Sequence, residues 1–280
     1  MKATIIITNY NKEQYLTEAI ESALSQDFFD FEVLIIDDGS TDKSASIIKS
    51  FQEKNSLIRT IYQNNKGVIA TRNIAIKQAK GEYIVQLDGD DKLDKNYLKW
   101  TVPILSNSDE LGIVFCKTEF FGLKTGVWDL GEYSLVNQLT TNQIVVTGLF
   151  RKADFLRTKG YNQDFAKGYE DWDFWLSLLD LGLQVHKINK VGFYYRIIEN
   201  SRNSSFSKDV ERQLKTLIYK GHPNLYLSNG LDPVNLLWKI KEKDLEIYDL
   251  KLFKNSLEYK VGHLFLFPLR LIQKLFKQFL

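Results

Sequence analysis

The sequence predicts an α/β fold in which a mostly parallel sheet is flanked by helices. Short apolar segments alternate with helical patterns over the first hundred residues, which is the order of a parallel sheet with right-handed crossovers. The segments are continuously apolar, as expected of strands buried on both faces. Polar clusters follow the predicted strands, so the expected ligand site is the carboxyl edge of the sheet.

The predicted strands are short runs of apolar and β-branched residues. They span 3–7, 31–36 and 83–87. A further apolar run at 112–116 ends in the single cysteine, Cys116, which cannot form an internal disulfide. We expect this residue to be a buried thiol of a protein in a reducing compartment rather than a nucleophile.

Helical patterns separate the predicted strands. Apolar residues recur at intervals of three and four over 12–25, which draws one stripe along a helix. The pattern is weaker over 42–51, where Thr41 or Asp42 is the expected cap. A third helix is predicted over 68–79, between two glycines that mark its start and its end.

Composition and charge exclude several classes of protein. Of the 280 residues, 44% are hydrophobic and 26% are charged, which excludes disordered, collagenous and disulfide-stapled chains. Lys and Arg total 37 and Asp and Glu total 35, so no overall field attracts nucleic acid. The apolar start is too short for a signal peptide, and the apolar stretch at 264–269 is too short to span a bilayer. We therefore expect a cytoplasmic protein without a nucleic-acid partner.

Three polar clusters follow the predicted strands, at 8–11, 37–42 and 88–91. Carboxylates gathered at one sheet edge repel each other unless a cation or a donor-rich ligand neutralises them. Asp88 and Asp90 are two residues apart and can face one ligand together, which suits a divalent metal such as Mg²⁺ or Mn²⁺. The alternative is an acidic turn followed by a helix cap.

These segments together resemble the family 2 glycosyltransferases, which have the GT-A fold. The matching segments are ITNYN at 7–11, IDDGSTD at 36–42, GVIATRN at 67–73, GEYI at 81–84, LDGDD at 87–91 and GYEDWD at 168–173. The resemblance covers roughly the first 200 residues, in the expected order. It implies a Rossmann-like catalytic domain at 1–205, with a nucleotide-sugar half at about 1–100 and an acceptor half at about 101–205. A helical extension would follow at 206–280.

The resemblance assigns roles at the predicted sheet edge. Nucleotide-sugar binding falls to Thr8, Asn9, Tyr10, Asp38, Arg72 and Asp88. Thr8 and Asp38 would contact the base, with Asp38 accepting a hydrogen bond from a ring N–H of uracil or thymine. Asp90, together with Asp88, would ligate the Mn²⁺ or Mg²⁺ that bridges the diphosphate. The alternatives are a turn hydroxyl for Thr8, a helix cap for Asp38 and a solvated helix residue for Arg72.

The pair Glu170 and Asp171 opens a predicted helix over 170–181. An acidic first turn also fits a well-capped amphipathic helix, because the helix dipole favours negative charge there. The resemblance instead makes Asp171 the general base of an inverting sugar transfer. Glu170 would support the site by orienting an acceptor or a loop. Trp172 is expected either in the core or at a cleft edge, stacked on an acceptor sugar.

One segment departs from the family pattern. Many members carry a histidine shortly after a Tyr-Arg pair, whereas this chain has YRIIENS at 195–201. The metal or phosphate role of that histidine is therefore not carried over. Arg196 and Ser201 remain candidates for a loop that closes on the diphosphate. A surface loop without a role is the alternative.

The last 21 residues, 260–280, carry four basic residues and no acidic ones. At 100° per residue, the apolar side chains of 269–280 fill one half of a helical wheel and the polar ones fill the other. A cationic amphipathic helix of this kind lies in the interface of an anionic membrane. Docking onto the catalytic domain or a partner helix is the alternative.

The sequence thus leads to a metal-dependent, inverting glycosyltransferase. Its donor would be a nucleotide-diphosphate sugar, a UDP-sugar by preference, and its acceptor a hydroxyl of a glycan or lipid-linked glycan in bacterial surface polysaccharide or glycoconjugate synthesis. It would work in the cytoplasm or at the inner face of the membrane. The alternatives are a sugar-phosphate nucleotidylyltransferase, whose Gly-rich triphosphate loop is missing after the first predicted strand, a receiver-like module, and an inactive scaffold subunit.

Overall fold

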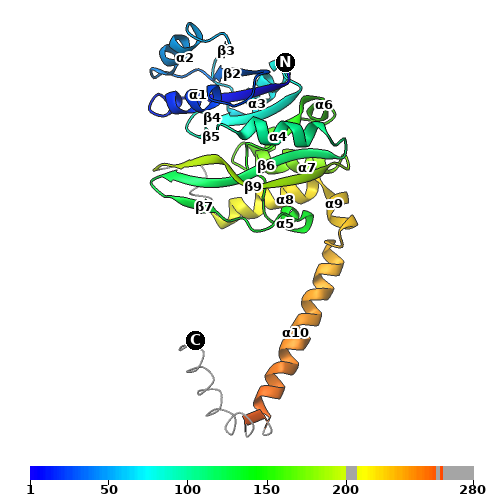
Figure 1. Ribbon diagram of the computed structural model, residues 1–280. Helices are drawn as coiled ribbons and strands as arrows, with labels where there is room; N and C mark the ends of the chain where they lie inside the picture. The colour runs from blue at the N-terminus through cyan, green and yellow to red at the C-terminus, as the bar shows by residue number, and fades with distance from the viewer. Residues whose placement is uncertain (200–206, 257–258, 261–280) are drawn as a thin grey trace, which may run out of the picture. The chain divides into compact units, whose positions relative to one another are not determined.

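The computed structural model describes residues 1–199, 207–256 and 259–260. Ser201 and the basic segment 261–280, both singled out in the sequence, lie outside these residues. The chain divides into two compact units, Met1–Leu225 and Tyr226–Leu280 (Figure 1). The first unit contains the sheet and most of the described helices. The division into a catalytic domain at 1–205 and an extension at 206–280 stays a prediction.

The first unit is built on one sheet, which has nine strands among the described residues. The strands are β1 (Ala3–Asn9), β2 (Phe31–Asp37), β3 (Ile58–Tyr62), β4 (Tyr83–Asp88), β5 (Lys92–Leu93), β6 (Leu111–Gly122), β7 (Gly126–Trp128), β8 (Leu149–Arg151) and β9 (Gln184–Ile197). Their order is β3-β2-β1-β4-β8-β6-β9-β5, with β7 paired to β6. The pairs among β1 to β4 and the β6–β9 pair are parallel, and the others are antiparallel.

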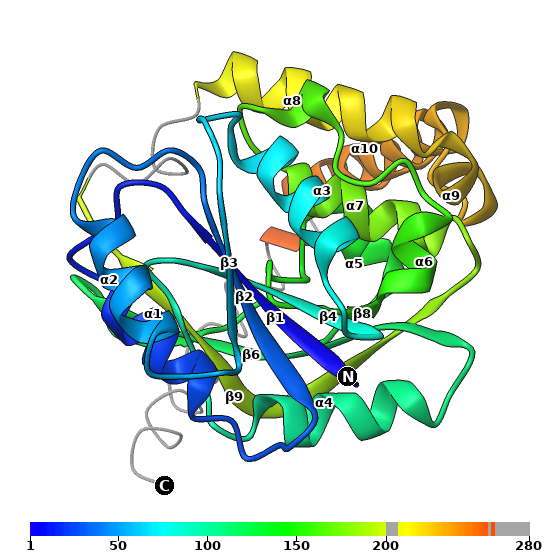
Figure 2. The same cartoon turned by 90° about the horizontal axis from the view of Figure 1, so that it is seen from above.

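The first three helices of this unit follow the alternating order that the sequence predicts for the first hundred residues. The helices of this unit are α1 (Leu16–Leu24), α2 (Ser44–Gln52), α3 (Val68–Gln78), α4 (Tyr97–Ser106), α5 (Leu135–Thr140), α6 (Lys152–Leu156), the 3₁₀ turn Gln163–Phe165, α7 (Glu170–Leu179) and α8 (Lys208–Gly221). Helix α9 (Pro223–Ser228) follows at the boundary between the units. Seen from above, α1 and α2 lie on one side of the sheet, and α3 and α7 lie on the other (Figure 2).

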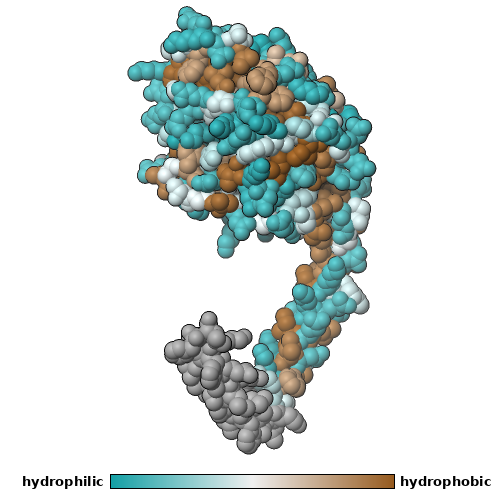
Figure 3. Space-filling view, in the orientation of Figure 1, coloured by the Kyte–Doolittle hydropathy of each residue, from teal (hydrophilic) through white to brown (hydrophobic). Residues whose placement is uncertain are grey.

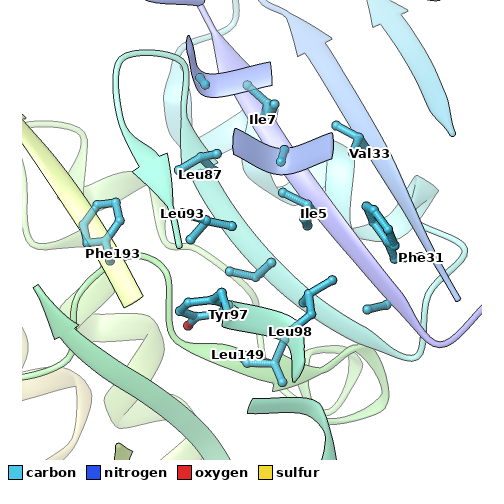
Figure 4. Packing of buried hydrophobic residues seen from close by; sticks show 14 of the residues in the cluster. Ile5, Ile7, Phe31, Val33, Leu87, Leu93, Tyr97, Leu98, Leu149 and Phe193 are labelled. Carbon is cyan, nitrogen blue, oxygen red and sulfur yellow. The ribbon is translucent and has the colours of Figure 1, made fainter. Parts of the chain in front are cut away.

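The hydrophobic core beneath α1 and α4 explains why the central strands are apolar without interruption. Ile5 and Ile7 of β1 belong to this core, together with Tyr97 and Leu98 of α4 (Figure 4). Ile6 lies between them in sequence and is also fully buried, because it faces the helices on the other side of the sheet.

The strands predicted over 3–7, 31–36 and 83–87 and the helices predicted over 12–25, 42–51, 68–79 and 170–181 are confirmed, with boundaries that differ by a few residues. The helix expected over 269–280 lies outside the described residues. The edge strand β3 was not predicted, because its pattern is only partly apolar and most of its residues are half-buried. The expected cap of α2 is wrong: the N-cap residue is Lys43, although the Asp42 carboxylate accepts a hydrogen bond from the Ser44 N–H at 2.9 Å. Cys116 is a buried thiol in β6, and burial, with a smaller contribution from Asp94, raises its pKa to about 12.

The second unit contains α10 (Pro233–Asn255), which begins after Asp232. The Asp232 carboxylate caps the helix by accepting hydrogen bonds from the N–H groups of Val234 and Asn235. Apolar and polar side chains alternate along the surface of α10 (Figure 3). Among the described residues, no helix combines the length and the apolarity that crossing a membrane requires.

Candidate active site

A pocket of about 540 Å³ lies at the carboxyl edge of the sheet, where β1, β2 and β4 end. Eight of the residues predicted to bind the donor, the metal or the diphosphate line it: Thr8, Asn9, Tyr10, Asp38, Arg72, Asp88, Asp90 and Arg196. The parallel register sets Thr8 beside Asp88 and Asn9 beside Asp37. Segments far apart in the sequence therefore meet at the edge where parallel sheets bind ligands.

The end of β1 supplies two fixed polar side chains and one exposed ring. The Thr8 hydroxyl donates to Asp88 Oδ1 at 2.9 Å, and the Asn9 amide donates to Asp37 Oδ1 at 2.8 Å. Tyr10 is 47% exposed, which leaves its ring available to a ligand in the pocket. A Cβ atom at Gly89 would lie 2.9 Å from Asn9 Oδ1, so a larger residue between the two aspartates of the predicted metal site would require the Asn9 side chain to shift.

Asp38 orders the loop that leads into α3. Its Oδ1 accepts hydrogen bonds from the Gln63 side chain at 2.6 Å and the Lys66 N–H at 2.9 Å, and its Oδ2 accepts from the Gly67 N–H at 2.9 Å. Gly67 has a φ of 81°, a left-handed conformation that favours glycine at this N-cap. Asp38 thus lines the pocket and also holds the loop that forms its wall. The acidic cluster in the sequence does not predict this second role.

Arg72 of α3 links the pocket to α7. Its guanidinium donates to Asp88 Oδ1 at 2.8 Å and to Glu170 Oε1 at 2.9 Å, while its side chain is only 2% exposed. Burial on its own would lower the pKa of Arg72, but the charges of Asp88 and Glu170 raise it above its usual value. Arg72 lines the pocket, with its two Nη groups engaged by two carboxylates of the protein, and its binding to a nucleotide stays a prediction.

The turn after β4 gathers three carboxylates, those of Asp88, Asp90 and Asp91. Asp91 is 2% exposed, and its burial together with the charges of the other two raises its pKa well above its ordinary value. Among the described residues, no group of three or more His, Cys, Asp or Glu side chains is arranged to hold a metal ion. One or two carboxylates suffice where substrate phosphates complete the coordination, and the oxygen donors of this turn fit a hard divalent cation.

Arg196 lies in β9 rather than in a loop. Its backbone N–H donates to Asp91 Oδ1 at 2.8 Å, and its Nε donates to the Asp90 carbonyl at 2.7 Å. The guanidinium carbon lies 4.6 Å from the ring centre of Tyr15 and 4.1 Å from that of Phe121. These contacts fix Arg196 as a support of the aspartate turn, in contrast to the closing loop that the sequence suggests.

Helix α7 begins at Glu170, directly after Tyr169, which adopts a left-handed conformation with φ 68°. This conformation is unfavourable for a non-glycine residue and turns the chain sharply into the helix. Asp171 is half-buried beside Glu170, and its Oδ1 accepts the Trp172 N–H. Neither acidic residue lines the described pocket, but Arg72 connects Glu170 to its wall.

Trp172 lies in the interior of the first unit. It is 2% exposed, and its indole N–H donates to the Gln138 carbonyl at 2.7 Å. The ring therefore packs as a core residue, which is one of the two roles expected for it, and it is buried away from an incoming sugar.

Two cations that contact acidic residues of this unit have no signal in the sequence. Lys12, in the loop after β1, donates to Asp90 Oδ2 at 2.5 Å. His222, after α8, contacts Asp180 at 2.5 Å and Asp173 at 3.1 Å, which ties α8 to the helix that carries Glu170 and Asp171. Burial on its own would lower the pKa of His222. The hydrogen bonds to both aspartates outweigh this effect and raise the pKa to about 9. All three contacts join residues far apart in the chain, so no local pattern predicts them.

Sequence comparison relates the chain to enzymes that transfer sugars. It is 32% identical over 259 residues to the UDP-Glc:alpha-D-GlcNAc-diphosphoundecaprenol beta-1,3-glucosyltransferase WfaP of Escherichia coli, covering 81% of this chain and 93% of that protein. It is 29% identical to the poly(ribitol-phosphate) beta-N-acetylglucosaminyltransferase TarS of Staphylococcus aureus over 70% of this chain, but this match spans only 35% of TarS.

Solved structures share the fold, and a family model identifies the chain. The structure of TarS residues 1–349 with UDP-GlcNAc matches with a TM-score of 0.67 and 25% identity, over 79% of this chain and 66% of that one. A mannosyltransferase of Pyrobaculum calidifontis matches in fold alone, with a TM-score of 0.56, 14% identity and coverage of 93% and 82%. Residues 4–164 match the model described as glycosyl transferase family 2. The chain therefore belongs to glycosyl transferase family 2 and has the GT-A fold.

Proposed function

We propose that the protein is an inverting, metal-dependent glycosyltransferase that uses a UDP-sugar. The observation that carries this proposal is the gathering of the predicted donor residues around one pocket at the carboxyl edge of the sheet. A UDP-sugar is favoured because WfaP is described as using UDP-Glc and TarS is described in complex with UDP-GlcNAc. Thr8, Tyr10 and Asp38, which line this pocket, would contact the nucleotide.

Asp90, with Asp88, would hold Mn²⁺ or Mg²⁺ in this enzyme. When bound, the cation supplies positive charge that stabilises the departing diphosphate. Asp88 is oriented by Thr8 and Arg72, and the turn is held from β9 by Arg196. The protein therefore holds these carboxylates in the lining of the pocket before the donor arrives.

Asp171 would act as the general base. Its carboxylate takes the proton from an acceptor hydroxyl as that oxygen forms a bond to the anomeric carbon. The bond between this carbon and the diphosphate oxygen breaks on the opposite face, and its electron pair leaves with UDP. One displacement of this kind inverts the anomeric configuration. Glu170, held by Arg72, would fix the start of α7 so that Asp171 keeps its orientation.

The acceptor would be a lipid-linked glycan or a growing polymer in bacterial surface polysaccharide or glycoconjugate synthesis. This assignment rests on the acceptors in the names of WfaP and TarS, a diphosphoundecaprenol-linked GlcNAc and poly(ribitol-phosphate). The basic amphipathic pattern of 261–280 would bind the anionic inner face of the membrane, where a lipid-linked acceptor resides.

Nucleotide release tests this function. UDP-, GDP- and dTDP-sugars are each incubated with the protein in Mn²⁺ or in EDTA, and the free nucleotide is measured. We expect slow release of UDP from a UDP-sugar in Mn²⁺ and none in EDTA. Equal release in EDTA would overturn the metal dependence, and release from GDP- or dTDP-sugars alone would overturn the choice of UDP.

A further inference from the structure

Lys12 forms an ion pair at the predicted metal position. It lies in the loop between β1, which ends at Asn9, and α1, which begins at Leu16. Its Nζ is 2.5 Å from Asp90 Oδ2, and both residues line the pocket. The ammonium therefore already pairs with one oxygen of the carboxylate predicted to ligate the metal.

The three aspartates of the turn differ in how firmly their partners are held. Asp88 pairs with Arg72, which is 2% exposed and is tied to Glu170 at its other end. Asp91 is buried and accepts a backbone N–H from Arg196, which cannot move away without breaking β9. Asp90 pairs with a lysine whose side chain is 31% exposed on a flexible four-carbon stem. The cation at Asp90 can be exchanged, whereas the partners at the other two are fixed.

We propose that Lys12 is a tethered counter-cation that gives way to the metal of the nucleotide sugar. In the donor-free protein its ammonium neutralises Asp90, so a free divalent cation has to displace it. When metal and diphosphate enter together, Lys12, which lines the same pocket, moves from Asp90 to the diphosphate oxygens. The proposal rests on the metal-dependent function proposed above, and it makes metal binding depend on the nucleotide.

The physical reason is charge balance within a small volume. A carboxylate beside two others is unfavourable without a nearby positive charge, and Lys12 supplies one before the donor is present. A metal-diphosphate group brings both a cation for Asp90 and anionic oxygens for Lys12, so the exchange leaves no charge unpaired. A metal ion alone brings no partner for the displaced ammonium, so it should bind more weakly.

The test compares three variants by Mn²⁺ binding, followed by electron paramagnetic resonance of the free ion. Lys12→Met removes the ammonium and Lys12→Arg keeps the charge. Lys66→Met is the matched control, because Lys66 lines the same pocket and its backbone N–H donates to Asp38. Without nucleotide, we expect Lys12→Met to bind Mn²⁺ about three- to tenfold more tightly than the parent, and the other two to stay within about twofold. In saturating Mn²⁺, Lys12→Met should bind UDP more weakly in calorimetry, because the diphosphate no longer gains the displaced ammonium.

The outcomes separate this inference from the proposed function. Unchanged Mn²⁺ affinity in Lys12→Met, with UDP still tightening Mn²⁺ binding in the parent, overturns the role of Lys12 alone. An equal gain in Lys12→Met and Lys66→Met also overturns it, since the effect would then be the general field of the pocket. No Mn²⁺ binding by any of the proteins, with or without UDP, overturns both the metal-dependent function and the exchange.

Discussion

Arg72 and Glu170 form a buried ion pair, with Nη1 of the guanidinium 2.9 Å from Oε1 of the carboxylate. Their side chains are 2% and 4% exposed, and the other end of the guanidinium holds Asp88 in the pocket. The pair therefore connects the aspartate turn after β4 to the start of α7. A buried charge needs this kind of compensation, because removing one partner leaves the other desolvated and unpaired.

Glu170→Gln should lower stability because it leaves Arg72 with one charged partner instead of two. We expect a loss of about 1 to 3 kcal/mol in the free energy of unfolding, measured by urea denaturation. The matched control is Glu82→Gln, which removes the carboxylate of a pair with Lys2 that is half exposed. Solvent screens that pair, so little change is expected there. Equal losses in the two variants would contradict the importance of the buried pair.

Asp171→Asn should abolish sugar transfer without weakening UDP binding. The amide keeps the size of the side chain but cannot take a proton, so kcat should fall by roughly 10² to 10⁴. Calorimetric titration with UDP and Mn²⁺ should give an unchanged Kd. Asp90→Ala is the complementary variant, since it should weaken metal-dependent UDP binding. Transfer at the normal rate by Asp171→Asn would show that another group is the base.

His222 should make stability depend on pH. The two aspartates raise its pKa in the folded protein from 6.5 to about 9. Its stabilising contribution, roughly 2 to 3 kcal/mol, is therefore full below about pH 6.5 and is lost as the pH rises through about 9. Unfolding of the parent and of His222→Gln should differ most near pH 6 and least near pH 10. A difference that stays constant over this range would mean that His222 does not titrate as described.

Removal of residues 261–280 should abolish membrane binding. The full chain is expected to sediment with liposomes that contain anionic phospholipid, and to bind neutral liposomes less, because four basic residues lie in the last 21. The truncated protein should stay in the supernatant and release UDP from a soluble donor at the normal rate. Equal binding by both proteins would exclude this segment as the membrane contact.

The sequence predicts the parts of the site that depend on local pattern. Thr8, Asp38 and Asp90 follow apolar strands, and parallel strands bring their ends to one edge, so their gathering in one pocket could be expected. The ion pairs of Lys12 with Asp90 and of Arg72 with Glu170 could not, because each joins residues more than 70 positions apart. Such pairs depend on side-chain placement in the finished fold, which no periodicity encodes.

At Arg196, the local composition predicts the wrong secondary structure. Polar residues follow it in the chain, and that composition favours a loop, whereas the backbone continues as β9 to Ile197. Pairing with β6 explains why this segment is a strand, since eleven residue pairs align β6 and β9. Propensity is a weak guide where a long neighbouring strand supplies hydrogen-bond partners.

The most direct test of the central claim is the configuration of the sugar that the enzyme first releases. UDP-glucose, an α-linked donor, is incubated with the protein and Mn²⁺ without an acceptor, so that water takes the acceptor's place, and proton NMR follows the anomeric signals before they equilibrate. A single displacement predicts that β-glucose appears first, and that Asp171→Asn releases almost none. Release of α-glucose first would contradict an inverting mechanism with Asp171 as its base.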